Sequence, residues 1–542
     1  MYAELTLSGS YRETGSRINS FVAGARRESF YFEEFYRRCA TIRTNRRIRR
    51  VLVHVKASFS AAGIAPLEEI RHELQRLAES GKELVFFATE YRDIHLYLAS
   101  VCARRIIHPL GSVSCVGFAR TAVYLKRITE RLGIPIEVVR RGRYKSAADP
   151  VRIDAMDPAE AEQWRAWLET VTGTVHEAIA TGYGVERSAL GELLAGRTLD
   201  ATEACERGWV EDAAPIDEIR ERWRAEGGRR ARLRVKRHAG TGKRICVLVF
   251  EGAIVEGADR NHPLLGQSVG SDSFVRQVDR LSRSRRVKAV VLRVASGGGS
   301  AIASEDIRCA LTRLAGRKPL VVSMGAIAGS GGYWIAMTGS TVVARATTLT
   351  GSIGVITLVA ALGEALARHD ITHSTIRTHE HADAQRGFRP LTPVEIAELD
   401  RQVGSIYERF IELVARTRTM DPDLVRENAE GRVWSGRHAC DRGLVDRVGG
   451  LADAVEEARQ VAGISKARVD FLPGSKRSLI ARLLGGASRS TVSPIPPYGV
   501  LRAPAATIDD LVNRPLLLCP AGRTGLLDAR ALDLLDAYLQ IE

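Results

Sequence analysis

The sequence predicts an α/β protein built from two homologous halves in tandem. Its 542 residues exceed what one hydrophobic core usually supports, so the length alone indicates at least two domains. Segments 196–219 and 431–455 share Gly-Arg, Ala-Cys and Arg-Gly-x-Val at matched positions, and Cys205 and Cys440 are 235 positions apart. Motifs that repeat at one offset are the signature of an internal duplication.

The same offset, with small insertions and deletions, pairs residues 49–88 with residues 288–325. Each segment has a β-branched apolar run, a turn rich in small residues, an amphipathic stretch and a second apolar run, which predicts strand, loop, helix and strand. Strands that alternate with helices favour parallel pairing through crossover connections. We therefore expect α/β halves over residues 50–228 and 244–465.

Three segments lie outside these halves. Residues 1–49 form an N-terminal extension, in which we predict a helix, and residues 229–243 form a basic linker. Residues 466–542 form a C-terminal extension, with a stretch rich in proline and serine before an apolar, helical end. The sequence assigns no function to either extension.

Charge and cysteine content restrict the classes of function. The formal net charge is +15, with arginine concentrated in residues 37–50 and 229–243. These runs allow peripheral contact with an anionic membrane, but no aromatic residues are interleaved with them, so we expect no nucleic-acid partner. The eight cysteines form no C-x-x-C pair and the histidines have no zinc spacing. We expect reduced thiols and neither a metal nor a cofactor.

Hydropathy predicts neither a signal peptide nor a transmembrane anchor. The first 30 residues lack a continuous apolar region. The apolar stretches 319–344 and 346–363 are rich in small and hydroxyl-bearing residues, so we predict the buried interior of an α/β core there. We expect the protein in the cytoplasm or peripherally at a membrane.

Ser330, in "AIAGSGGYWIA" (326–336), is a candidate nucleophile of the second half. A glycine-rich turn, 297–299, follows a predicted strand about 30 residues earlier and lets backbone N–H groups approach a ligand closely. The turn has neither Walker A nor G-x-G-x-x-G spacing, which makes a nucleotide site a weak interpretation. Ser330 also fits a simple helix N-cap, and its own surroundings leave both interpretations open.

A serine nucleophile requires a base. The four histidines that follow Ser330, at 369–381, lie in a polar stretch for which we predict a solvated loop. In the first half, "EVVRRGRYKSAADP" (137–150) is a β-branched strand that ends near Lys145. Serine–lysine dyads are an alternative to the histidine triad, but Lys145 must be neutral to accept a proton, which requires burial. Taken alone, Lys145 also fits a surface lysine at a strand end.

The duplication favours the catalytic interpretation. Aligning residues 86–100 with residues 322–337 puts Asp93 where Ser330 stands, and no lysine occurs in the second half at the place that corresponds to Lys145. Each half keeps what the other lacks. We therefore predict one composite site that uses both halves.

Five stretches resemble, in order, the motifs of the signal peptide peptidase A (protease IV) family in its long, two-half form. They are "RGRYKSAADP", "RVASGGGSAIAS", "MGAIAGSGGYW", "TLTGSIGVI" and "GRVWSGRHACDRGLVD". The resemblance covers residues 50–460 and implies tandem duplicated ClpP/crotonase-like domains. It further implies a serine endopeptidase for unfolded or hydrophobic peptides, such as cleaved signal peptides, assembled as a bowl-shaped homotetramer.

The resemblance also implies site residues. Ser330 matches the family's nucleophile, Lys145 its general base and Ser352 a serine that orients the lysine. The oxyanion hole carries over to the backbone N–H groups of Gly298 and Gly331. The sequence departs from the family in having glycine at 297, where a proline is usual, and in lacking the usual N-terminal membrane anchor.

Two other functions remain as alternatives. A crotonase-type acyl-CoA enzyme would use the same fold and oxyanion hole, but it would need another base and a basic nucleotide pocket, and it gives Lys145 no role. An inactive binding scaffold of the same fold is suggested by the altered oxyanion loop and the C-terminal extension.

Overall fold

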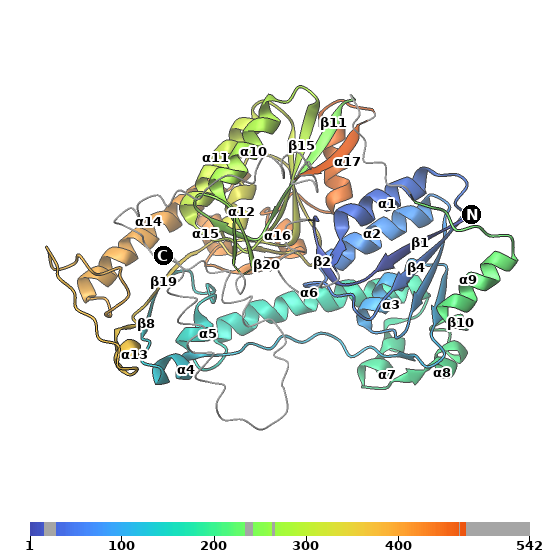
Figure 1. Ribbon diagram of the computed structural model, residues 1–542, viewed down its shortest axis with the longest axis horizontal. Coiled ribbons are helices and arrows are strands. Elements are labelled where there is room, and N and C mark those ends of the chain that lie inside the picture. The colour runs from blue at the N-terminus through green and yellow to red at the C-terminus, as the bar shows by residue number, and fades with distance from the viewer. Residues whose placement is uncertain (16–28, 234–241, 263–265, 466, 473–542) are drawn as a thin grey trace.

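The computed structural model describes residues 1–15, 29–233, 242–262, 266–465 and 467–472. Part of the predicted linker 229–243 and nearly all of the extension 466–542, with its proline-rich stretch, the helix predicted at its end and Cys519, lie outside the described residues. Figure 1 shows two α/β bodies side by side, the first half coloured from blue to green and the second from yellow-green to orange-red.

The first half is built on a five-stranded parallel sheet in the order β1-β4-β5-β6-β10. Helices α1, α2 and α3 connect its first four strands. The bounds are β1 (Tyr2–Leu7), α1 (Phe32–Thr44), β4 (Arg50–Val55), α2 (Ala65–Glu79), β5 (Glu83–Ala88), α3 (Asp93–Ala99), β6 (Arg104–Ile107) and β10 (Asp212–Ala213).

The second half is built on an eight-stranded sheet in the order β20-β18-β16-β15-β11-β22, with β17 paired to β16 and β21 paired to β17. Every pairing is parallel except that of β18 with β20. The bounds are β11 (Arg244–Glu251), α10 (Ser271–Arg283), β15 (Val287–Ser296), α11 (Ala301–Ala315), β16 (Leu320–Gly329), α12 (Gly331–Ala336), β17 (Val342–Ala344), β18 (Leu349–Gly351), β20 (Val433–Ser435), β21 (Arg447–Val448) and β22 (Arg468–Leu472).

The two sheets confirm the predicted tandem α/β architecture. The order β1, α1, β4, α2, β5, α3, β6 recurs as β11, α10, β15, α11, β16, α12, β17. Strand β1 and helix α1 lie before the predicted start of the first half at residue 50, and β22 lies after the predicted end of the second at 465. The sequence pattern did not reveal these two edge strands. Strand β1 ends 43 positions before its partner β4 begins, and β22 is only five residues long.

The remaining elements surround the sheets. In the first half they are β2 (Ser10–Arg12), β3 (Ser29–Tyr31), β7 (Ser112–Val113), α4 (Lys126–Arg131), β8 (Ile136–Arg141), α5 (Asp149–Arg152), α6 (Pro158–Tyr183), the 3₁₀ turn Arg187–Leu190, α7 (Gly191–Leu194), β9 (Leu199–Asp200), α8 (Ala201–Glu206) and α9 (Ile216–Ala225). In the second half they are β12 (Ala253–Val255), β13 (Arg260–His262), β14 (Gly266–Gly270), β19 (Val355–Ala360), α13 (Gly363–Ala367), α14 (Pro393–Arg418), α15 (Pro422–Asn428), α16 (Gly436–Asp441) and α17 (Leu451–Val461).

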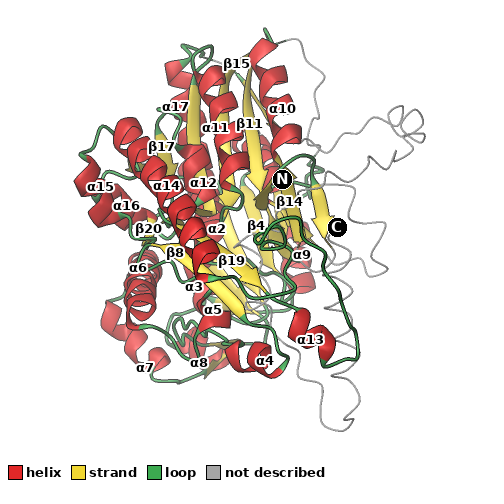
Figure 2. Ribbon diagram, turned by 90° about the vertical axis from the view of Figure 1, so that its left-hand side faces the viewer, coloured by secondary structure: helices red, strands yellow, loops and turns green. Residues whose placement is uncertain are grey.

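The strands of the second sheet are buried on both faces, which explains their nearly continuous apolar sequence. Along β11, Val247 belongs to the core that also contains first-half residues, whereas its neighbour Leu248 packs toward α10 and α11. This alternation follows from the two-residue period of a strand. Figure 2 shows α10, α11 and α12 over one face of the sheet. Helices α2 and α17 contact β16 from the other.

Two features join the halves. Strands β8 and β19, from different halves, pair antiparallel from Arg141 opposite Val355 to Ile136 opposite Ala360. Helix α6 runs beneath both halves (Figure 1) and contacts α3 and β20. The Asp157 side chain caps α6 by accepting from the Ala159 N–H, and proline occupies its first position, which favours initiation there.

A buried ion network also crosses the junction. Arg293 of β15 is 1% exposed and donates to Glu69 of α2 at 2.8 Å and to Glu13 at 2.9 Å. Glu69 also accepts from Arg345 at 3.0 Å and from the Leu451 N–H at 3.0 Å. Burial by itself raises the pKa of Glu69, but the charges of Arg345 and Arg293 outweigh it and lower this pKa to about 2.

We expect Glu69→Ala to lower the free energy of unfolding by about 3–5 kcal/mol, because it leaves Arg293 with one fewer buried counter-charge. Because the pKa is about 2 in the folded chain and ordinarily 4.5, the ionic contribution is present above pH 4.5 and lost as the pH falls toward 2. Urea denaturation at pH 7 measures the loss. Glu79→Ala, at an exposed position of the same helix, should change stability by less than about 0.5 kcal/mol.

Candidate active site

Ser330 lies in the sharp turn between β16 and α12. Its φ of 52° and ψ of −121° are unusual for a residue with a Cβ and cost about 1–3 kcal/mol. Hydrogen bonds hold the turn: the Ser330 N–H donates to the Gly351 carbonyl at 2.9 Å, and its carbonyl accepts from the Trp334 N–H at 2.9 Å. The Ser330 side chain makes no capping hydrogen bond to α12, so the N-cap interpretation does not apply.

Gly298 and Gly331 lie in close contact with their neighbours at this turn. A Cβ added to Gly298 would lie 2.7 Å from the Gly331 nitrogen and 2.9 Å from the Ser330 Cβ, and the φ of Gly298 is +113°. A Cβ added to Gly331 would lie 2.6 Å from the Ser304 Oγ. Position 298 therefore requires glycine, whereas a side chain at position 331 requires the Ser304 hydroxyl to move. The Gly298 N–H donates to the Ser296 Oγ at 3.2 Å, a long bond that a better acceptor can replace.

Lys145 reaches Ser330 from the first half. It follows β8 by four residues, and contacts with the second half fix its loop: the Tyr144 N–H donates to the Glu430 carbonyl at 2.8 Å. Gln163, buried on α6, donates to the Tyr144 carbonyl at 3.3 Å and accepts from the Val433 N–H at 2.9 Å. One side chain thus links α6, the lysine loop and β20.

The Lys145 ammonium nitrogen Nζ meets three oxygen atoms. It lies 2.9 Å from the Ser330 Oγ, 2.9 Å from the Ser352 Oγ and 2.9 Å from the Ser352 carbonyl oxygen. A charged lysine can donate to all three. A neutral lysine has two N–H groups and one lone pair, so it can donate to both Ser352 oxygens and accept from the Ser330 hydroxyl.

Burial lowers the proton affinity of Lys145. Its side chain is 3% exposed, and burial lowers the pKa of Lys145 from 10.5 to about 7. No charged neighbour contributes to the shift. A large fraction of the molecules therefore carries a neutral Lys145 at neutral pH, whereas an unperturbed lysine would be neutral in about one of a few thousand.

Ser352 lies directly after β18 and also has a positive φ, 50°. Its N–H donates to the Arg432 carbonyl at 2.7 Å, which positions both of its oxygen atoms beside Lys145. All five residues expected at the site, Ser330, Lys145, Ser352, Gly298 and Gly331, thus belong to one cluster.

Gln163, Glu430 and Gly431 also belong to this site, although the sequence did not predict them there. Gly431 has φ +70°, and a Cβ there would lie 2.7 Å from the Lys145 Cβ. The Glu430 carboxylate accepts from the Arg143 N–H at 3.0 Å. Gly431 opens one of the repeated segments, a signal that pointed to its place in the fold but not to its contact with Lys145.

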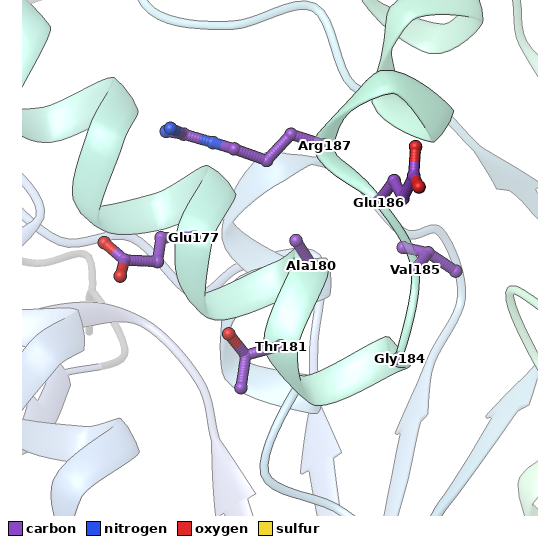
Figure 3. A pocket seen from close by; sticks show the side chains of 7 residues that line it. All are labelled: Glu177, Ala180, Thr181, Gly184, Val185, Glu186 and Arg187. Atoms are coloured by element: carbon purple, nitrogen blue, oxygen red, sulfur yellow. The ribbon is translucent and has the colours of Figure 1, made fainter.

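Other groups that could form a functional site do not belong to the Ser330 cluster. The four histidines at 369–381 are exposed, as expected for a solvated loop, and His381 Nδ1 lies 2.8 Å from a Glu395 carboxylate oxygen. All described cysteines are free thiols. A shallow hollow at the end of α6 contains no residue of the Ser330 cluster (Figure 3), being lined by Glu177, Ala180, Thr181, Gly184, Val185, Glu186 and Arg187.

The apolar stretch 319–344 forms β16, α12 and β17 and is largely buried, as expected. Among the described residues, every helix is too short or too polar to cross a bilayer.

A serine hydroxyl beside a buried amine of lowered pKa is an arrangement that can activate the serine as a nucleophile. This is the chemistry of the serine hydrolases, and it assigns the site to that class. Peptidase family S49 matches the chain twice, at residues 76–228 and 312–465. The chain belongs to peptidase family S49 and is a serine-type peptidase of two tandem S49 regions. This confirms the family resemblance and favours a peptidase over an acyl-CoA enzyme.

Known relatives agree with this family. Protease 4 of Salmonella typhi is 30% identical over 461 residues, which cover 79% of this chain and 71% of that protein. Protease 4 of Haemophilus influenzae is 28% identical over 488 residues, which cover 84% of this chain and 78% of that protein. The chloroplastic serine protease SPPA of Arabidopsis thaliana is 27% identical over 433 residues, which cover 77% of this chain and 64% of that protein. The structure of ClpP1 from Listeria monocytogenes aligns at 15% identity with a TM-score of 0.24, over 38% of this chain and 92% of that one.

We expect Gly431→Ala to lower kcat for peptide cleavage by about 10²-fold, because the new Cβ must displace Lys145 from Ser330 and small displacements within an active site cost this much. Gly443→Ala is the matched control: Gly443 has the same φ of +70°, but its added Cβ would meet only the Met420 Sδ, at 3.8 Å. Both variants should lose about 1–2 kcal/mol to the left-handed backbone. Equal kcat values for the two would contradict the proposed constraint on Lys145.

Proposed function

We propose that the chain is an endopeptidase in which Ser330 is the nucleophile and Lys145 the general base. The observation that carries this is the 2.9 Å contact between the Lys145 Nζ and the Ser330 Oγ, together with a pKa of about 7 for a lysine buried without a counter-charge. A base whose pKa lies near the working pH combines a useful neutral fraction with proton affinity.

The reaction begins when the Ser330 Oγ attacks the peptide carbonyl carbon and its proton passes to the Lys145 Nζ. The carbonyl oxygen becomes an oxyanion, and the N–H groups of Gly298 and Gly331 donate to it, the first exchanging its long bond to Ser296 for a stronger one. The Lys145 ammonium then gives its proton to the leaving amine as the C–N bond breaks.

An acyl-enzyme on Ser330 remains. Water attacks the ester carbonyl, Lys145 accepts the water proton, and the same proton returns to the Ser330 Oγ as the acid product leaves. Throughout, the two oxygens of Ser352 accept from the Nζ and keep its third position directed at Ser330. Ser352 therefore positions the base.

Apolar peptides are the substrate class we propose, including unfolded chains and cleaved signal peptides. Ile327 supports this, because it is only partly buried and its Cδ1 atom lies 3.4 Å from where a Cβ on Gly297 would stand. Assembly as a homotetramer and peripheral contact with an anionic membrane remain parts of the same proposal.

The proposed dyad is tested by intact-mass measurement after treatment with a fluorophosphonate. We expect one adduct on the wild-type chain, none on Ser330→Ala, and labelling slowed by about 10²–10⁴-fold in Lys145→Ala, the usual contribution of a general base. Lys126→Ala, at a more exposed lysine of the first half, should label at the wild-type rate. A correctly folded wild-type chain that never labels would favour the inactive scaffold, and rapid labelling of Lys145→Ala would exclude the dyad.

The pH profile is a separate test. Because the base must be neutral, kcat/KM should rise with pH through about 7 and fall tenfold per unit well below it. Hydrolysis of an uncharged apolar peptide between pH 5 and pH 9 gives the profile. A rate that still rises tenfold per pH unit between pH 8 and pH 9 would mean that Lys145 keeps the pKa of an exposed lysine and is not the buried base.

A further inference from the structure

The first half contains a counterpart of the Ser330 site, built from different side chains. Asp93, the first residue of α3, aligns in sequence with Ser330, which precedes α12, and Cys115 aligns with Ser352. Both pairs are 22 positions apart, and "Cys-Val-Gly" after β7 corresponds to "Ser-Ile-Gly" after β18. The third member of the cluster, His176, comes from α6.

These three side chains converge inside the first half. The Cys115 thiol donates to the Asp93 Oδ1 at 3.0 Å, and the Gly117 N–H donates to the same oxygen at 2.9 Å. A carboxylate oxygen of Asp93, the Cys115 Sγ and a ring nitrogen of His176 all lie within 4.8 Å of one another. All three residues are buried.

His176 shows that this cluster is not a completed hydrogen-bond network. The residue is 7% exposed, and its Nε2 has no hydrogen-bond partner within the described part of the chain. A buried polar atom without a partner costs about 1–3 kcal/mol, so such atoms call for a physical explanation. A thiolate, an imidazole and a carboxylate that converge are the donor set that suits Zn²⁺.

We propose that Asp93, Cys115 and His176 form a binding site for a divalent transition-metal ion, Zn²⁺ by its ligand chemistry. Binding forms a zinc–sulfur bond as the Cys115 thiol proton leaves to solvent, and the imidazole and carboxylate coordinate without losing a proton. The Gly117 N–H and the Val116 N–H, which donates to the Asp93 Oδ2 at 3.2 Å, remain as outer partners that orient the carboxylate. Three protein ligands leave one coordination position for water.

The ion would tie three separate segments together. Asp93 begins α3, Cys115 follows β7, and His176 lies on α6, the helix that also carries Gln163 to the lysine loop. The site therefore holds α6 against the first sheet at one end while Gln163 positions the other end. It does not depend on Ser330 or Lys145 being catalytic.

Metal analysis of the full chain tests the site. After incubation with Zn²⁺ and desalting, we expect about one equivalent per wild-type chain, measured by mass spectrometry of the metal. Competition with a chromophoric chelator should show Cys115→Ser and His176→Gln binding at least about 100-fold more weakly, since even outer partners contribute about 10- to 100-fold. Cys102→Ser, at a buried cysteine of the same half outside the cluster, should bind like wild type.

Co²⁺ gives a readout on the wild-type chain itself, which does not depend on how well the variants fold. Bound to the folded wild-type chain, it should produce a thiolate-to-cobalt charge-transfer absorption, together with visible bands of tetrahedral intensity. Asp93→Asn, which keeps the shape of the side chain, should weaken both. A folded wild-type chain that retains no Zn²⁺ and shows no charge-transfer absorption with Co²⁺ overturns the proposal, and so does a charge-transfer band that persists in Cys115→Ser.

Discussion

The pairing of β8 with β19 is the interaction on which the active site depends. Its last pair, Arg141 opposite Val355, lies four residues before Lys145 and three residues after Ser352. The register of this ribbon therefore sets how far Lys145 lies from Ser352. A slip of one residue would move the strands by about 3.3 Å relative to each other, more than the 2.9 Å that separates the Nζ from the Ser352 Oγ.

Closure of the junction also determines the chemistry of the base. A lysine on an open first half would be solvated and charged at neutral pH, whereas packing against the second half excludes water and lowers the pKa of Lys145 to about 7. The network of Arg293, Glu69 and Glu13 lies across the same junction, and removal of one partner leaves a buried charge. Loss of one partner therefore weakens the closed arrangement on which the lowered pKa of Lys145 depends.

Backbone strain is concentrated around the serine–lysine contact. Ser330, Ser352 and Glu430 all have positive φ, although each has a Cβ, and the adjacent Gly431 has φ +70°. Such conformations persist only where surrounding hydrogen bonds determine them, here from the Ser330 N–H to Gly351 and from the Ser352 N–H to Arg432. In the first half, Asp93 and Cys115 keep the spacing of the two serines, but neither has a positive φ. Duplication thus preserved the spacing, while the local backbone and the chemistry of the two sites diverged.

The sequence by itself determined the tandem α/β halves, because apolar periodicity and repeated motifs are local properties of the chain. It also placed Ser330 and Lys145 in one composite site, because each half lacked what the other kept. Only the tertiary structure brought in Gln163 and Gly431, added β1 to the first sheet, and brought His176 to Asp93 and Cys115. These contacts join residues separated by tens to hundreds of positions, and no periodicity encodes such distances. The pKa of Lys145 was likewise decided by tertiary structure, because burial depends on what the second half places around it.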